Sequence, residues 1–243
     1  MLTLAMDTTS SAASLAVLED DRVIATTSTD TREFHSATLF RELEVLLGEL
    51  SLTLDRFELY AVANGPGSFT GVRIGLSAAK AWAEAFTRPV AAISTLEAQA
   101  AQAPSSCSRI ASVLDARRGQ VYRGYYQREK GSFDSPLALM GPEAVMEQPE
   151  FREELWNHSL QGELSIATSA PTVVSDILSQ GEPPAPTPRS ILIHTVPAIL
   201  APSVGRLGYL RARQGRLADS LSADANYLRR TDAELHLKGS PPI

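Results

Sequence analysis

The chain has 243 residues, with 22 Lys and Arg against 28 Asp and Glu, and a formal net charge of −6. This length fits one large domain or two modest ones, and 44% hydrophobic with 21% charged residues is typical of a globular chain. A single cysteine, Cys107, excludes an intramolecular disulfide and a cysteine-based zinc site. No apolar run reaches the roughly 18 residues of a membrane span, and Asp7 ends the N-terminal apolar run, so we expect a cytoplasmic protein without membrane contacts.

The first hundred residues alternate short apolar runs with amphipathic stretches. Polar or charged turns separate the first three runs, which predicts short antiparallel strands. Leucines at three- and four-residue spacing predict the first helix. We expect strands at 2–6, 12–18, 22–27, 59–63 and 90–93, and helices at 35–50, 72–86 and 95–103.

The same pattern starts again near residue 110. An apolar run ends at Asp115, and a polar turn and a new strand follow, as they do after Asp7. This weak internal repeat predicts two α/β subdomains, 1–104 and 105–243. In the second, the proline-rich stretch 181–188 predicts a loop.

The C-terminal part of the chain is basic although the whole chain is acidic. A helix is expected at 201–213. The arm from 202 to 230 carries six arginines and two aspartates, a net charge of +4. The arginines of such an arm usually lie on a solvent-exposed helix face. The more specific alternative is that they make a weak contact with phosphate or RNA.

A glycine-rich loop, Asn64 to Gly71, lies between a predicted strand and a predicted helix. Gly65, Gly67 and Gly71 allow positive φ and expose backbone N–H groups at a helix N-terminus, a geometry that holds phosphates. The loop matches neither the P-loop nor the dinucleotide-binding motif. We favour the simpler interpretation, in which the glycines let the helix pack closely on its neighbours.

Small residues recur every four positions along the helix that follows this loop. Gly71, Gly75, Ala79 and Ala83 form one smooth stripe on which another helix can pack. This stripe could face the first helix of the same subunit, or a partner's helix. In the second case, Phe69 and Trp82 would be natural anchors.

The two aspartate turns suggest nucleotide chemistry only weakly. Asp7-Thr8-Thr9 resembles the first phosphate-binding hairpin of actin-like ATPases, but its turn has no glycine, and the turn after Asp115 carries two bulky arginines. An actin-like ATPase or small-molecule kinase that uses Asp7-Thr8-Thr9 and the Gly65–Gly71 loop stays as the alternative function. The four histidines are too far apart for a helical metal-binding pair, so we expect no metal site.

Four motifs in the same order as in a known family support a more specific hypothesis. GPGSFTGVRIG at Gly65–Gly75, Asp7-Thr8-Thr9, DARRGQVY at Asp115–Tyr122 and YLRRTDAE at Tyr227–Glu234 together resemble the TsaB (YeaZ) family. The resemblance implies an actin-like (ASKHA, ribonuclease H-like) duplicated fold of two α/β subdomains.

The resemblance also implies a function. Such a protein is a non-catalytic scaffold and activator that pairs with a TsaD-like catalytic subunit and works with a TsaE-like ATPase. The complex places threonylcarbamoyl on N6 of the adenosine next to the anticodon of tRNA. This chain would therefore contact tRNA only indirectly, through the complex. A homodimer is a further expectation, and this chain alone would bind no cofactor, with ATP or ADP bound only in the complex.

The resemblance places the pairing surface on the two helices of the first subdomain. The expected interface residues are His35, Leu39, Leu43, Phe69, Val72, Arg73, Gly75, Leu76, Ala79 and Trp82. The remnants of phosphate-type loops are Asp7, Thr8, Thr9, Gly65, Gly67, Gly71 and Asp115.

Overall fold

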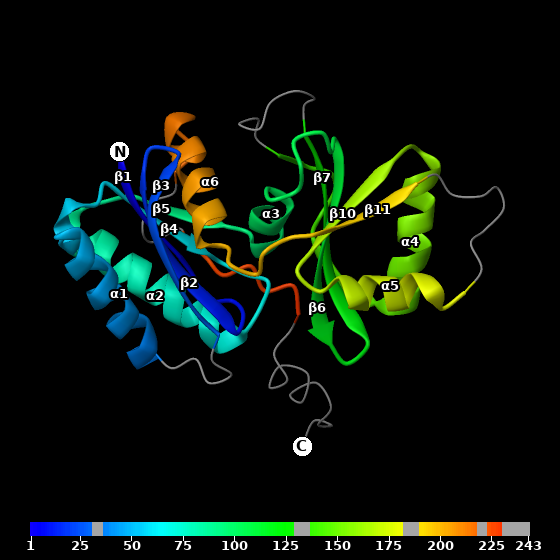
Figure 1. The fold of residues 1–243 in the computed structure, drawn as a ribbon, viewed down its shortest axis with the longest axis horizontal. Coiled ribbons are helices and arrows are strands. Elements are labelled where there is room, and N and C mark those ends of the chain that lie inside the picture. The colour runs from blue at the N-terminus through cyan, green and yellow to red at the C-terminus, as the bar shows by residue number, and fades with distance from the viewer. Residues whose placement is uncertain (31–35, 129–136, 182–189, 218–222, 230–243) are drawn as a thin grey trace, which may run out of the picture.

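The computed structural model describes residues 1–30, 36–128, 137–181, 190–217 and 223–229. The first sheet has five strands in the order β3-β2-β1-β4-β5 (Figure 1). β1, β2 and β3 are antiparallel, whereas β4 and β5 run parallel to β1. The strands are β1 (Leu2–Asp7), β2 (Ala12–Glu19), β3 (Arg22–Asp30), β4 (Leu59–Ala63) and β5 (Val90–Ile93).

The second sheet repeats this plan. Its order is β11-β10-β6-β7-β8, and β9 also pairs with β7. The β6–β7 hairpin is antiparallel, and β10 and β11 run parallel to β6, so the strands correspond to those of the first sheet, with β8 and β9 together in the place of β3. The predicted duplication is therefore confirmed. The strands are β6 (Arg109–Arg117), β7 (Gln120–Gln127), β8 (Ala138–Leu139), β9 (Ala144–Glu147), β10 (Leu164–Thr168) and β11 (Ile191–Thr195).

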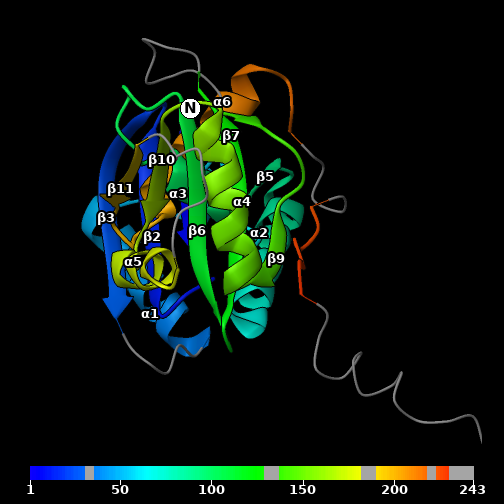
Figure 2. The same cartoon turned by 90° about the vertical axis from the view of Figure 1, so that its right-hand side faces the viewer.

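Helices cover both faces of each sheet (Figures 1 and 2). On the first sheet, α1 and α2 bury one face, where Leu4 and Met6 point, and α6 buries the opposite face around Ala5. On the second sheet, α3 covers one face and α4 with α5 the other. The helices are α1 (Ser36–Leu50), α2 (Phe69–Phe86), α3 (Thr95–Ala100), α4 (Gln148–Leu160), α5 (Pro171–Ser179) and α6 (Ala201–Arg213), and a short 3₁₀ turn spans Leu54–Arg56.

The two halves exchange helices, which corrects the simple division into 1–104 and 105–243. The sheets do separate near residue 104, but α3 packs on the second sheet, and α6 returns to the first. Gly205 and Gly208 make the return possible, because a Cβ on Gly205 would lie 2.2 Å from Leu18, and one on Gly208 would lie 2.9 Å from Ala61. The second subdomain is therefore not formed by 105–243 alone.

Most predicted elements lie within a few residues of their expected bounds. α2 starts three residues earlier than predicted, at Phe69, because Ser68 caps it by accepting the Gly71 N–H at 3.2 Å. α3 ends at Ala100 rather than at 103. Nearly all of the predicted loop 181–188 lies outside the described residues.

Candidate functional site

The turn after β1 is folded around the carboxylate of Asp7. Thr9 donates both its backbone N–H, at 2.8 Å, and its hydroxyl, at 2.6 Å, to Asp7 Oδ1. Asp7 is fully buried, and its Oδ2 has no hydrogen-bond partner in the described part of the chain. Burial raises the pKa of the Asp7 carboxyl to about 6, although the hydrogen bonds from Thr9 lower it. This carboxylate therefore supports its own turn.

The glycine loop packs directly on this turn. A Cβ on Gly71 would lie 1.8 Å from the carbonyl oxygen of Thr8, and a Cβ on Gly67 would lie 2.4 Å from that of Thr9. The Ser68 N–H donates to the Thr9 carbonyl at 2.7 Å, and the Thr8 hydroxyl donates to the Gly71 carbonyl at 2.6 Å. These contacts leave no space for a phosphate between turn and loop. The glycines serve close packing here, the simpler of the two interpretations given above.

The second aspartate turn reproduces the first at the level of hydrogen bonds. Asp115 Oδ1 accepts the N–H of Arg117, two residues on, at 2.7 Å, just as Asp7 accepts that of Thr9. Arg117 also pairs with Asp115 Oδ2 at 3.2 Å. Asp115 is partly exposed, so the two duplicated turns differ in burial.

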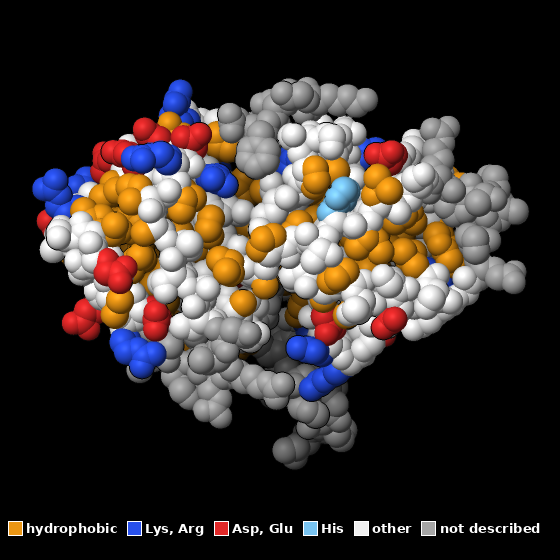
Figure 3. All heavy atoms as spheres, viewed as in Figure 1, with side chains coloured by type: hydrophobic (Ala, Val, Ile, Leu, Met, Phe, Trp, Pro, Cys, Tyr) orange, Lys and Arg blue, Asp and Glu red, His pale blue; other side chains and the backbone are white. Residues whose placement is uncertain are grey.

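A cleft of about 480 Å³ lies between the two halves. Three segments line it: the glycine loop with the first turn of α2, the β6–β7 turn, and residues 226–229. Basic side chains gather at the turn end of β6 and β7, beside a hollow between the halves (Figure 3). Asp7, Thr8, Thr9 and Asp115 are not among the lining residues. The two aspartates therefore do not face one another across an open nucleotide site.

The predicted partner interface requires correction. Six of its residues are buried inside the subunit and cannot meet a partner: Leu39, Leu43, Val72, Gly75, Leu76 and Ala79. The small-residue stripe faces inward because a Cβ on Gly75 would lie 2.5 Å from the Thr8 hydroxyl and 3.2 Å from Val62. Trp82 is half-buried, whereas Phe69 and Arg73 are exposed. His35 lies outside the described residues.

The outward face of α1 and α2 carries apolar residues that the sequence analysis missed. Phe40 is 48% exposed and Val45 is 53% exposed. The Phe40 ring meets Trp82 edge-on, with centroids 6.3 Å apart, so the two helices share this surface. The signal was present, since Phe40 and Val45 lie off the buried leucine stripe of α1. We call Phe40, Val45, Phe69 and Arg73 the α1–α2 face.

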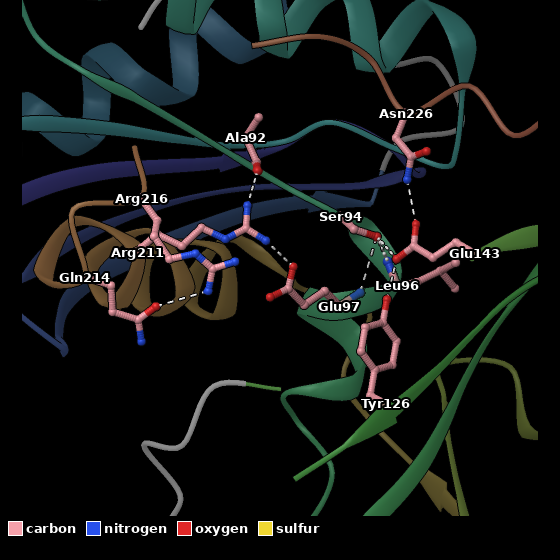
Figure 4. Close-up of polar contacts among 10 residues, drawn as sticks. All are labelled: Ala92, Ser94, Leu96, Glu97, Tyr126, Glu143, Arg211, Gln214, Arg216 and Asn226. Carbon is pink, nitrogen blue, oxygen red and sulfur yellow. Dashed lines mark hydrogen bonds and ion pairs between the residues drawn. The ribbon is translucent and has the colours of Figure 1, made fainter. Parts of the chain in front are cut away.

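A polar network around Glu143 joins four distant segments (Figure 4). Its carboxylate accepts hydrogen bonds from Ser94 at 2.5 Å, from Asn226 at 2.6 Å and from the Tyr126 hydroxyl. The Asn226 N–H donates in turn to the Asn64 carbonyl at 2.7 Å. Sequence reasoning missed Glu143 because its partners lie 17 to 83 residues away.

A second polar link in the same region crosses from α6 to the β5–α3 junction. Arg211 donates to the Ala92 carbonyl at 2.5 Å and to the Glu97 carboxylate (Figure 4). Burial raises the pKa of Glu97, and Arg211 opposes that shift. Together with the Glu143 network, this link fixes the segments that connect the two halves.

The described histidines lie apart from one another. His158 stacks on Tyr125 with ring centroids 3.9 Å apart, and burial lowers the pKa of His158. His194 Nε2 lies 3.4 Å from the Cys107 sulfur and 3.3 Å from the Ser165 hydroxyl. Over the described ranges, no three His, Cys, Asp or Glu side chains gather in a group that could hold a metal. None of the helices in the described part of the chain is long and apolar enough to cross a membrane.

Two α/β halves of matching topology, each beginning with an antiparallel hairpin that carries an aspartate near its turn, define an actin-like protein, as predicted. A family model described as "TsaD: tRNA N6-adenosine threonylcarbamoyltransferase" matches residues 25–150. The chain is 33% identical over 161 residues to the Escherichia coli tRNA threonylcarbamoyladenosine biosynthesis protein TsaB, covering 64% of this chain and 69% of that protein. The chain belongs to the TsaB (YeaZ) family, which confirms the resemblance.

Further relatives agree with this assignment. The Bacillus subtilis protein of the same name is 39% identical over 131 residues, covering 54% of this chain and 57% of its own length. The matched part thus spans somewhat more than half of this relative. A solved structure of YeaZ from Pseudomonas aeruginosa superimposes with a TM-score of 0.74 at 28% identity, covering 93% of this chain and 99% of the other.

Proposed function

We propose that this protein is a non-catalytic subunit in the synthesis of threonylcarbamoyladenosine in tRNA. The names of the Bacillus subtilis and Escherichia coli relatives support the pathway. The packed Asp7 turn is the observation that carries the non-catalytic role. Because the backbone around Gly67 and Gly71 contacts Thr8 and Thr9 directly, the turn cannot cradle a phosphate as an actin-like ATPase would.

The role of such a subunit is to bind and activate a TsaD-type catalytic subunit, assisted by a TsaE-type ATPase, in the cytoplasm. Similarity of residues 25–150 to the TsaD model supports a partner of similar fold. The α1–α2 face is the surface proposed for this contact, since Phe40, Val45 and Phe69 are exposed on it and the Arg73 guanidinium lies over the Phe69 ring. Aromatic and arginine side chains of this kind dominate binding at interfaces. The same face would form the homodimer when the partner is absent.

Light scattering coupled to chromatography tests the pairing, with the TsaD-type subunit of the same organism. We expect a one-to-one complex with the unmodified chain. Phe40→Glu with Val45→Glu should weaken it by roughly 30-fold or more, because a charge replaces an apolar anchor in a desolvated contact. Leu192→Glu, a matched change at a residue that is 42% exposed on β11, should have no effect. If the double variant assembles as the unmodified chain does, the α1–α2 face is not the pairing surface.

The alternative function, an ATPase or small-molecule kinase, makes a different prediction. It requires the isolated chain to bind Mg·ATP and to lose this binding in Asp7→Asn. We expect no heat of binding at millimolar ATP from the isolated chain, and ATP or ADP bound only in the assembled complex. Asp7-dependent binding by the isolated chain would favour the alternative.

A further inference from the structure

The mouth of the cleft carries a basic and aromatic surface that adjoins the α1–α2 face at Phe69. The β6–β7 turn contributes Arg117 and Arg118, both exposed, and the tail contributes Tyr227 and Arg229. We call these four residues the cleft rim. They concentrate positive charge on a chain whose net charge is −6, next to the hollow visible in Figure 3.

The backbone of the β6–β7 turn holds the two arginines at the rim. Arg117 has φ +62° and Arg118 has φ +56°, in the left-handed region that glycine and asparagine favour. The Arg117 side chain is 85% exposed, and its partner Asp115 is also open to water, so an anion competes easily for this guanidinium. Arg229 is anchored at the neighbouring wall, where it donates to the Ala116 carbonyl at 3.0 Å.

The aromatic part of this surface is already ordered. Tyr227 is 46% exposed and packs on Phe69 with ring centroids 5.0 Å apart. The Arg73 guanidinium lies 3.8 Å from the Phe69 ring centroid, and its Nε donates to the Tyr227 hydroxyl at 3.1 Å. An exposed, fixed aromatic ring beside arginines is the arrangement on which unpaired bases stack.

We propose that the cleft rim binds single-stranded RNA, with Arg117 and Arg118 on phosphates and Tyr227 under a base, while Arg229 holds the wall through its bonds to the Ala116 carbonyl and to Gln120. This inference rests on the proposed function, and it makes an unpaired loop of the tRNA a direct ligand of this chain. A free nucleotide fits less well, because the turn at Asp7 that would hold its phosphates is filled by Gly67 and Gly71. Arg117 and Arg118 are exposed, as contacts to a continuous phosphate backbone require, whereas Arg229 is half-buried.

Fluorescence anisotropy with a labelled tRNA transcript tests this, on the full chain alone and on its complex with the TsaD-type subunit. Between 50 and 200 mM salt, the magnitude of the slope of log affinity against log salt should decrease by roughly 1.4 in the double variant Arg117→Gln, Arg118→Gln, because each phosphate contact on a single strand contributes roughly 0.7. Replacing both arginines by lysine should keep the slope. Tyr227→Ala should lower affinity roughly 5- to 100-fold and leave the slope unchanged.

The matched control is Arg22→Gln with Arg213→Gln, two exposed arginines away from the cleft rim, and it should bind tRNA normally. An unchanged slope in the Arg117, Arg118 double variant would overturn the inference. The inference would also be overturned if the unmodified chain binds ADP and the same variant loses ADP binding but still binds tRNA. The site would then be one for a free nucleotide. Chromatography of each variant with the TsaD-type subunit shows whether the pair still assembles, so failure of the proposed function can be distinguished from failure of the inference. If the pair never assembles, the proposed function fails, while tRNA binding by the chain alone still decides the inference.

Discussion

Asp7 shows at the scale of one residue how a buried carboxyl group makes the stability of the fold depend on pH. In the folded chain its pKa is about 6, against 3.8 for the ordinary side chain. Between these values, the folded form keeps a proton that the unfolded form has lost. The free energy of unfolding therefore decreases as pH rises from about 4 to 6, by roughly 3 kcal/mol in total from this group.

We expect Asp7→Asn to remove this dependence, because asparagine keeps an oxygen for the Thr9 donors but does not ionise. The variant should gain stability relative to the unmodified chain as pH rises from 4 to 6, and hold that gain at pH 8. Urea unfolding at pH 4, 5, 6 and 8 measures the difference. A constant difference across this range would show that folding does not shift the pKa of Asp7.

The glycines of the loop make a second prediction at this scale. Gly71→Ala should reduce the free energy of unfolding by more than about 3 kcal/mol, because its Cβ would lie 1.8 Å from backbone that cannot move away. Gly48→Ala is the matched control: Gly48 is exposed in α1, with nothing within 4 Å of its Cβ. Gly48→Ala should raise the free energy of unfolding by at most about 1 kcal/mol. Similar values for the two variants would show that the loop relaxes away from Thr8.

At the scale of residues, features made by neighbours in the sequence could be predicted, whereas features made by distant residues could not. The glycine loop was predictable, since its glycines lie together in the sequence between a strand and a helix. The small-residue stripe was expected to face the first helix or a partner's helix, and neither interpretation placed Gly75 on Thr8 and on Val62 of β4, because a stripe of small residues looks the same whatever it packs on. Glu143 could not be found, because Ser94, Tyr126 and Asn226 give no common local pattern.

At the scale of elements, Glu143 ties the tail segment 223–229 to the β5–α3 junction and to β7. Glu143→Ala should lower the free energy of unfolding by about 2 kcal/mol, since three donors lose a charged acceptor. It should also speed exchange of the Asn226 amide hydrogen, which reports the tail's bond to Asn64. Glu49→Ala, at an exposed position of α1, should change neither. Unaltered exchange at Asn226 would mean that other contacts hold the tail.

The elements of the second half were the hardest to predict. α4 buries only Phe151, Leu155 and Ser159, one residue per turn, so its apolar stripe is too narrow to give a clear helical period. β11 is a partly exposed edge strand without the continuous apolar burial of β10. The first half was easier, because β1 and β4 are buried runs between turn residues and α1 carries a full leucine stripe.

At the scale of the whole molecule, the exchange of α3 and α6 should make the two halves unfold together. Each half contains one of the two tryptophans, Trp82 in α2 and Trp156 in α4. In the single-tryptophan variants Trp156→Phe and Trp82→Phe, the urea transition followed by fluorescence should coincide with that followed by circular dichroism. A midpoint for Trp156 well separated from that for Trp82 would show that the halves are independent. No local sequence pattern predicts this exchange, because α6 meets strands that lie more than a hundred residues before it.

The position of α6 in the chain also matters while the protein is being made. The first sheet is complete at Ile93, but the helix that covers one of its faces begins at Ala201. At about 5–20 residues per second, the ribosome adds the intervening stretch in roughly 5–20 s. During that interval the apolar surface around Ala5, Leu18 and Leu59 has no cover from its own chain. The nascent N-terminal half therefore keeps one apolar sheet face exposed until the last helix emerges.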